Sequence, residues 1–210
     1  MTQTTRTTKR AQAHRLVLDA TAQDLLFRQA HTVDRFTDEP VSDETVRAIH
    51  DLVRHGPTAF NQQPLRMCLL RSPESRTRLA EHLSRSNREK TVRAPLTALL
   101  AVDNEFQRRL PDQFPQFPQA ADLFSGNRSL RERSALFNGA LQAAYFIIGI
   151  RAAGLAAGPM SGFDADGVNR AFFPDGHWSA LLVVNIGRPA ESGPRPRGPR
   201  LAYDEMCTTL

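Results

Sequence analysis

The longest helix that the sequence predicts, residues 128–153, constrains the fold more than any other feature. Ser129 and Glu132 have the spacing of a capping box, and Gly154 stands where a helix of about twice the usual length would end. From Leu136 to Ile150 the helix is apolar on nearly every face. Such a helix must be covered on all sides, and a chain of 210 residues has limited material for this. The sequence therefore favours a helix at a subunit interface over a central core helix in a monomer.

The composition is that of a globular protein, with 40% hydrophobic and 23% charged residues. No repeat, linker or break in composition divides the chain, so we expect a flexible tail over residues 1–14 and a single domain over 15–210. The net charge of +5 comes from arginines that are interleaved with acidic residues. This pattern argues against a nucleic-acid partner and favours a modest attraction for anionic cofactors.

The N-terminal residues 1–12 are rich in Thr, Arg and Lys and lack an apolar core, so no secretory signal is expected. No uninterrupted apolar run is long enough to span a bilayer. Cys68 and Cys207 are too few for a disulfide framework or a zinc site, and no other metal motif is present. We expect a cytoplasmic protein without a metal or a membrane partner.

Helical and extended segments alternate along the chain without hairpin signals, which favours an α+β or α/β sandwich with a central sheet. The clearest helix is capped by Ser42, carries a stripe of Val46, Ile49, Leu52 and Val53, and stops at Gly56-Pro57. The other predicted helices are residues 16–30, 73–84, 128–153 and 165–172, and the predicted strands are residues 65–70, 96–102 and 180–186.

Two Gly/Pro junctions point to a ligand site. The first, at Gly56-Pro57, is followed by the carboxamides of Asn61, Gln62 and Gln63, whose donors and acceptors match the polar edge of a flavin ring. The second junction, Gly158 to Phe163, lies far downstream and could meet the first across one site. Without that second junction, ordinary turn residues explain the carboxamides equally well.

Other chemistries lack their motifs. Ser161 in Gly-Pro-Met-Ser-Gly lacks the spacing of a nucleophile elbow, and Gly149 and Gly154 do not form a dinucleotide-binding turn. A nicotinamide would therefore be a visiting substrate. The Pro-rich segment 104–127 carries several phenylalanines and is either a lid over a site or a well-packed surface loop.

Four motifs, read in order from about Leu25 to the C-terminus, resemble those of the FMN-dependent nitroreductase family. They are Asp34-Arg35-Phe36 with Pro40-Val41, Gly56-Pro57-Thr58 with Asn61, Gln63 and Pro64, Gly158 to Asp164, and Arg200-Leu201. Within the family the chain is most similar to the malonic semialdehyde reductase (3-hydroxypropionate dehydrogenase) branch. The similarity to this branch rests on Asn87, Glu89-Lys90-Thr91, Ala94-Pro95, the segment 110–127 and the segment 199–205.

The resemblance implies an α+β three-layer sandwich, with a central mixed or antiparallel sheet flanked by helices and the long helix at the interface of a homodimer. It implies FMN as cofactor and NADH or NADPH as transient co-substrate. The backbone of Ser161 or Gly162 is expected near flavin N5, and Phe114, Phe117 and Phe124 are expected to line the substrate pocket. The residues implied in cofactor binding are Arg28, His31, Thr32, Thr58, Asn61, Gln63, Lys90, Ser161, Gly162, Arg197 and Arg200.

One departure from the family concerns the phosphate site. The family usually has an arginine, one further residue and then Ser or Thr, whereas this chain has His31 at the arginine position, followed directly by Thr32. His31 could donate a hydrogen bond to phosphate, Arg28 could supply the charge, or FMN binding could be weakened. Arg66 and Arg93 are candidates to hold a substrate carboxylate, although surface ion pairing is the favoured interpretation of both.

The family resemblance implies an oxidoreductase that passes hydride from NAD(P)H to a small carbonyl or nitro compound in a ping-pong scheme. A flavin-dependent oxidase or dehydrogenase of a biosynthetic intermediate that gives electrons to oxygen is the alternative. A non-catalytic flavin-binding protein is the third hypothesis.

Overall fold

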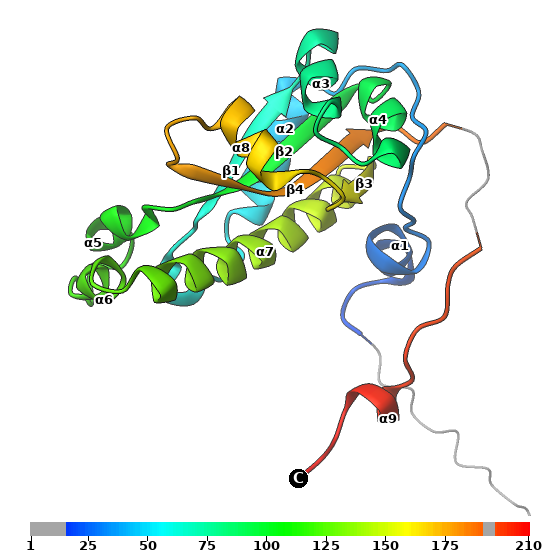
Figure 1. Ribbon diagram of the computed structural model, residues 1–210. Helices are drawn as coiled ribbons and strands as arrows, with labels where there is room; N and C mark the ends of the chain where they lie inside the picture. Colours follow the sequence, from blue (N-terminus) through cyan, green and yellow to red (C-terminus); the bar gives the residue numbers. More distant parts are fainter. Residues whose placement is uncertain (1–15, 191–195) are drawn as a thin grey trace, which may run out of the picture.

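A four-stranded antiparallel sheet forms the middle layer of the protein. The computed structural model describes residues 16–190 and 196–210, so the predicted tail 1–14 lies outside the described residues. The strands are ordered β1-β2-β4-β3 (Figure 1). Their bounds are β1 Leu65–Leu70, β2 Leu96–Asp103, β3 Ala156–Met160 and β4 Trp178–Gly187. The antiparallel arrangement confirms the predicted α+β sandwich.

Strand β2 lies at the centre of this sheet, and all eight of its residues are buried. Its side chains alternate between two cores, as a strand requires. Leu96, Ala98 and Leu100 face one helical layer, whereas Leu99 and Ala101 face the other.

The first layer consists of α2 (Asp43–Val53) and the long helix α7 (Arg128–Ala152), which pack on the same face of the sheet. Ser42 caps α2 as predicted, because its Oγ accepts the Thr45 N–H at 3.1 Å. Val46 and Ile49 enter the core, but Leu52 is 61% exposed. The predicted place of Leu52 in the apolar stripe that packs against the core is therefore wrong within a single chain.

The N-cap of the long helix α7 lies two residues earlier than the sequence suggested. The Asn127 side chain accepts the Leu130 N–H at 2.9 Å and is the N-cap, so the predicted Ser129–Glu132 capping box is wrong. At the other end Gly154 has a φ of 72°, which confirms the predicted glycine stop. By length and composition alone α7 could cross a membrane, as some buried core helices could. Its contacts with the sheet place it in the sandwich.

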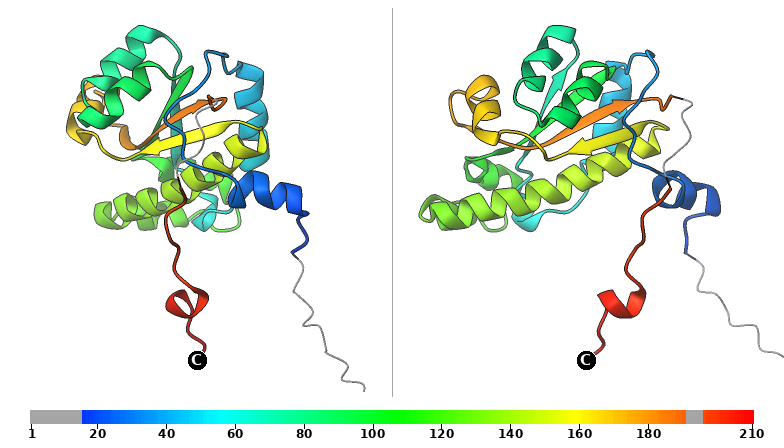
Figure 2. Two further views of the ribbon diagram at one scale, coloured as in Figure 1. Left: turned by 90° about the vertical axis from the view of Figure 1, so that its right-hand side faces the viewer. Right: turned by 45° about the vertical axis from the view of Figure 1, so that its right-hand side comes forward.

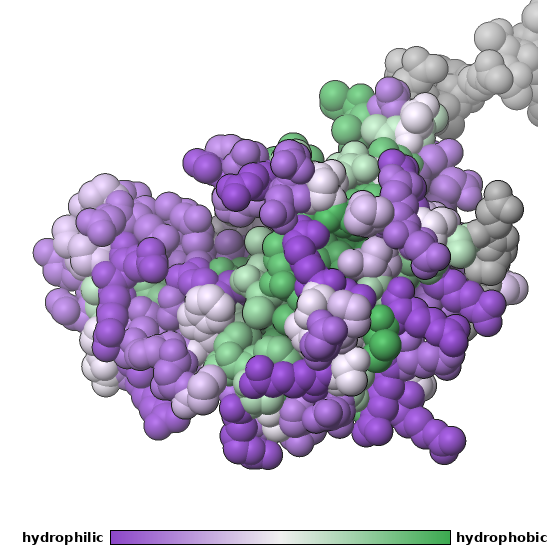
Figure 3. Space-filling model, turned by 90° about the horizontal axis from the view of Figure 1, so that it is seen from above, coloured by the Kyte–Doolittle hydropathy of each residue, from purple (hydrophilic) through white to green (hydrophobic). Residues whose placement is uncertain are grey.

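The second layer consists of α3 (Pro73–Ala80), α4 (Arg85–Val92) and α8 (Ala165–Phe172). Leu79 and Val168 pack here against Leu99 and Val183 of the sheet. Seen from this side, the surface is mostly polar, with a band of apolar residues visible through its centre (Figure 3). The predicted helix 73–84 ends earlier than expected, and α4 and β3 were not predicted.

The segment 104–127 folds into short helices at one end of the sandwich. These are η3 (Phe106–Arg109), α5 (Leu110–Gln113) and α6 (Ala120–Ser125). Phe106 and Leu110 are fully buried, and with Phe124 they form a third core against Ala135 of α7. The segment is therefore well packed within one chain.

Both ends of the described chain leave the layers. The predicted helix 16–30 is wrong in extent, because only α1 (Ala20–Gln23) and the wider turns of η1 (Asp24–Arg28) are helical. The C-terminal segment with α9 (Tyr203–Met206) runs away from the sandwich (Figure 2). Leu201, Tyr203 and Met206 are each more than 60% exposed, so this segment buries little apolar surface within its own chain.

Candidate functional site

The first group of predicted site residues lies in the turn from Thr58 to Pro64, which contains the short helix η2 (Ala59–Asn61). Phe60, Asn61 and Gln63 have φ values of 51°, 50° and 44°. Residues with side chains rarely adopt this left-handed conformation, and several in one turn mark a strained backbone that its surroundings must hold. Strain of this kind gathers at functional sites.

Buried carboxamides from α7 hold the turn. Asn138 Oδ1 accepts the Ala59 N–H at 2.8 Å, and Asn138 Nδ2 donates to Gln62 Oε1 at 3.1 Å. Ser134 Oγ lies 2.9 Å from the same Gln62 oxygen. Asn138 and Gln62 are each 1% exposed, so their hydrogen bonds are shielded from water and fix the turn firmly.

Arg66 fastens the other end of the turn. Its Nη1 donates to the backbone oxygens of Gln63 and Leu65 at 2.9 and 2.8 Å, and its Nη2 pairs with Asp103 at 2.5 Å. With these internal partners the guanidinium has little left for a substrate carboxylate. The other candidate, Arg93, pairs with Glu89 at 2.8 Å on the surface.

The predicted ligand contacts of this turn bond to one another. The Thr58 hydroxyl accepts the Gln63 N–H at 3.2 Å, and Gln63 Nε2 donates to Asn61 Oδ1 at 2.8 Å. Asn61 Nδ2 donates to the backbone oxygen of Gln113 in α5 at 2.9 Å. The turn is thereby coupled to the segment 104–127.

Phe60 in the turn also packs against the predicted substrate-pocket aromatics. Its ring centroid lies 5.6 Å from that of Phe114, 6.3 Å from that of Phe117 and 6.0 Å from that of Phe124. Phe124 is only 4% exposed, whereas Phe117 is 40% exposed. In one chain Phe124 is thus a core residue, Phe114 is half-buried, and Phe117 is the most exposed of the three.

The second group lies where β3 meets α4. The Gly162 oxygen accepts the Ser84 N–H at 2.9 Å and the Asn87 Nδ2–H at 3.2 Å. A Cβ on Gly162 would lie 2.9 Å from Ser84 Oγ, so only glycine fits here without movement. Asn87 and Lys90 are spaced to share one face of α4, and Lys90 is half-buried.

The third group gathers cations at the C-terminal end of α7. Arg197 Nη2 lies 2.7 Å from the Arg28 oxygen, 2.9 Å from the Ala30 oxygen and 3.3 Å from His31 Nε2. Arg151, in the last turn of α7, donates to the Leu26 oxygen at 2.8 Å. We call Arg151, Arg197 and the loop 26–31 the basic cluster. Arg200 instead donates to the Gly198 and Pro199 oxygens of its own segment.

Electrostatic repulsion is built into the basic cluster. Burial, and then the nearby charge of Arg197, lower the pKa of the Arg151 guanidinium below its usual range. Arg151 Nε is buried and has no hydrogen-bond partner. Among the ion pairs of the residues that the structure describes, none joins a carboxylate to Arg151 or Arg197. The cluster has the charge and the free donor that suit a bound anion.

The turn lies against the middle of α7, whereas the basic cluster lies at the C-terminal end of this helix. Asn138, which holds the turn, and Arg151 are 13 residues apart on this helix, which corresponds to about 20 Å. The structure therefore does not bring all predicted site residues together within one chain.

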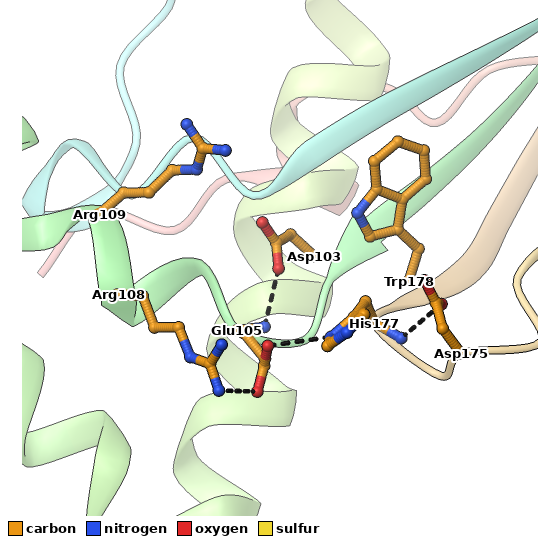
Figure 4. Close-up of a pocket in the computed structure, with 7 residues that line it drawn as sticks. All are labelled: Asp103, Glu105, Arg108, Arg109, Asp175, His177 and Trp178. Atoms are coloured by element: carbon orange, nitrogen blue, oxygen red, sulfur yellow. Dashed lines mark hydrogen bonds and ion pairs between the residues drawn. The ribbon is translucent and has the colours of Figure 1, made fainter.

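An open cavity of about 520 Å³ lies at the end of β2 nearest the turn (Figure 4). Its charged walls are largely paired internally: Glu105 contacts Arg108 at 2.6 Å and His177 at 2.9 Å. The lining contains none of the predicted site residues; it consists of Asp103, Glu105, Arg108, Arg109, Asp175, His177 and Trp178. Neither in this cavity nor elsewhere in the described part of the chain is a group of three His, Cys, Asp or Glu residues placed to hold a metal.

Comparison with known families decides the assignment. Residues 27–188 match the model of the nitroreductase family. The chain belongs to the nitroreductase family. Its members are oxidoreductases, which confirms the predicted enzyme class; the malonic semialdehyde reductase branch stays a prediction.

Individual relatives agree with the family. A Streptomyces coelicolor protein, named provisionally as an NADH dehydrogenase/NAD(P)H nitroreductase, is 60% identical over 93% of this chain and 99% of its own length. A provisionally named nitroreductase from Bacillus subtilis has the same fold, with a TM-score of 0.80 at 22% identity over 88% of this chain and 97% of its own. A provisionally named nitroreductase from Exiguobacterium sibiricum, solved in complex with FMN, has a TM-score of 0.78 at 18% identity over 93% of this chain and 99% of its own.

Several residues that shape the site carry no signal in the sequence. Asn138 and Arg151 belong to a helix whose sequence is mostly apolar, and the partners of both side chains lie far away along the chain. Asn87 was noted only as part of a branch motif, although its side chain positions Gly162.

Proposed function

We propose that this nitroreductase-family protein is an FMN-dependent enzyme that uses NADH or NADPH to reduce a small carbonyl compound, resembling malonic semialdehyde, or a nitro compound. The observation that carries the proposal is the basic cluster at the end of α7, whose charges have no carboxylate counterpart among the described residues. A flavin phosphate supplies the missing negative charge.

The residues present fit FMN. The basic cluster, with Arg28, His31 and Arg197, is suited to the phosphate, and Thr32 and Arg200 belong to the same segments. The Ser161–Gly162 backbone, with Lys90 on the adjoining helix, is suited to the ring, because glycine permits close approach. When bound, FMN would accept hydride from the nicotinamide and deliver it to the acceptor.

A homodimer completes the proposed site. The turn with Thr58, Asn61 and Gln63 lies about 20 Å along α7 from the basic cluster. The turn of a second copy is therefore the simplest source of the carboxamides that complete the site. Apolar surface for such an interface is present on α7, where Leu136 is 56% and Phe137 65% exposed. The exposed apolar residues of the C-terminal segment offer more.

The chain's own groups have limited tasks in this scheme. The Asn61 and Gln63 carboxamides would orient the flavin ring, and Lys90 would stabilise negative charge on it. The 161–162 backbone would fix the position of the ring in the site. We propose that residues 104–127 act as a lid within a single domain over 15–210, with Phe114 and Phe117 toward the ligand and Phe124 anchoring the segment in the third core. Because Asn61 is bonded to Gln113, this lid and the turn would exclude water together.

The proposed setting is a cytoplasmic enzyme with small-molecule substrates and no nucleic-acid or membrane partner. The interleaved charges of the chain support this setting.

The visible absorption spectrum of the purified protein tests the function. We expect a yellow protein whose absorbance bleaches when NADPH or NADH is added without oxygen. A yellow protein that neither nicotinamide bleaches would favour the oxidase alternative. A colourless protein that does not take up FMN would refute the proposal.

A further inference from the structure

Arg151, in the last turn of α7, is half-buried where this helix contacts the loop 26–31. Its Nη1 donates to the Leu26 oxygen at 2.8 Å, while its Nε is buried without a partner. Burying a guanidinium with an unused N–H is costly unless an acceptor arrives. The cost is increased by Arg197, whose charge lowers the pKa of Arg151.

His31 is poorly placed to replace the arginine that the family has at this position. Its Nε2 lies 3.3 Å from Arg197 Nη2. A guanidinium can only donate, so Nε2 accepts in this contact and only Nδ1 is left to donate to a phosphate. His31 thus offers a phosphate one donor, where an arginine would offer a fork of several.

Resting on the proposed function, we propose that Arg151 is a phosphate-binding residue of the FMN site and supplies the guanidinium that the family usually has at the position of His31. A guanidinium carries five N–H donors, and one of those of Arg151 is bound to the Leu26 oxygen, so it can hold the loop and offer further donors to the phosphate. Arg197 would approach the same phosphate from the C-terminal segment. The anion would thereby relieve the repulsion between the two arginines.

A purely structural role makes a different prediction. If Arg151 only ties α7 to the loop at Leu26, its loss would disturb the whole site and weaken any flavin. If it binds phosphate, its loss weakens FMN but spares riboflavin, which has the same ring and no phosphate.

The test compares the binding of FMN and riboflavin to the apoprotein by quenching of flavin fluorescence. We expect Arg151→Met to raise the Kd for FMN about ten- to hundredfold and that for riboflavin less than threefold, about what a lost charged hydrogen bond implies. Arg128→Met is the matched control, since Arg128 lies on the same helix with an 83% exposed side chain. It should change neither Kd.

Arg151→Lys is the second variant, for the case that Arg151→Met does not fold. A lysine keeps the charge without the fork, so it should bind FMN with an intermediate Kd and riboflavin as the wild type does. Equal losses for FMN and riboflavin, or no loss for FMN, would overturn the inference and leave the proposed function intact. A wild-type protein that binds riboflavin as tightly as FMN would also overturn it, and one that binds neither would overturn both.

Discussion

The turn 58–64, near the middle of α7, and the basic cluster, at its C-terminal end, hold backbone loops by opposite means. In the turn, buried neutral carboxamides and one paired guanidinium satisfy one another inside the protein. In the cluster, two guanidiniums bond mainly to backbone oxygens and lack a carboxylate among the described residues. The turn makes most of its hydrogen bonds within the chain, with Gln62 Nε2 buried without a partner, whereas the cluster lacks the negative charge that an anion would supply. Under the proposed function, one chain thus combines a rigid ring-binding element with an element that binding stabilises.

Arg66→Met should have the largest effect, because it leaves the Asp103 carboxylate buried without its partner. We expect the free energy of unfolding to fall by about 3 kcal/mol, as for other broken internal ion pairs. Urea denaturation measures this. The surface pair gives the control: Arg93→Met should cost less than about 0.5 kcal/mol. Equal costs would show that the turn is not held from Asp103.

Asn138→Ala should have the next largest effect. It removes the acceptor of the Ala59 N–H and a donor to the side-chain oxygen of Gln62, which stays buried. A loss of about 2 kcal/mol in the free energy of unfolding is expected. Gln116→Ala, at an exposed position of the 104–127 segment, should leave stability unchanged. A neutral Asn138→Ala would mean that the carboxamides do not fasten the turn.

Gly158→Ala tests the support of the basic cluster. A Cβ at this position would lie 2.5 Å from the Val33 oxygen, so the backbone after His31 would have to move away from β3. We expect thermal unfolding to report a loss of about 1.5 kcal/mol. The control Gly198→Ala has only an Arg200 side-chain atom at 3.8 Å and should be neutral. Retained stability in Gly158→Ala would indicate that the loop is not anchored to β3.

Arg197→Met should have the smallest effect on the protein without a ligand. Relief of repulsion with Arg151 offsets the exposed hydrogen bonds that are lost, so stability should stay within about 0.5 kcal/mol. Sulfate should show whether the cluster binds an anion. It raises the melting temperature of any protein by exclusion, but the melting temperature of the wild type should rise more than that of Arg197→Met. Equal gains would contradict an anion site at the cluster.

The sequence predicted the elements whose apolar residues repeat with a clear period. Strands 65–70 and 96–102 and helix 165–172 were located within a residue or two, because their burial follows a simple pattern. Helix α4 was missed because its sequence is mostly polar and only Thr91 is buried. No periodic signal exists in such a helix.

Strand β3 was missed for a different reason. Gly158-Pro159 reads as a junction, yet β3 lies at the edge of the sheet, where a proline is tolerated because it need not donate to a second neighbour. Gly158 lacks a side chain so that the Val33 oxygen can approach. The same residues therefore mark both a strand and the predicted ligand junction.

Motifs located the candidate site better than they described its supports. Thr58, Asn61, Gly162 and Arg197 stand in distinctive motifs or segments and were predicted, whereas Asn138 and Arg151 act on partners more than 70 residues away. Contacts across such separations leave no local pattern. Only the fold reveals them.

The length of α7 has a consequence for genetics. Under the two-copy site proposed above, each chain lends its turn to one site and its basic cluster to the other. A chain damaged at the turn and a chain damaged at the cluster would each be inactive with its own kind. Mixed together, they would form pairs with one intact site and one doubly damaged site. Two inactive alleles would therefore rescue one another, and the distance spanned by a single helix would be the reason.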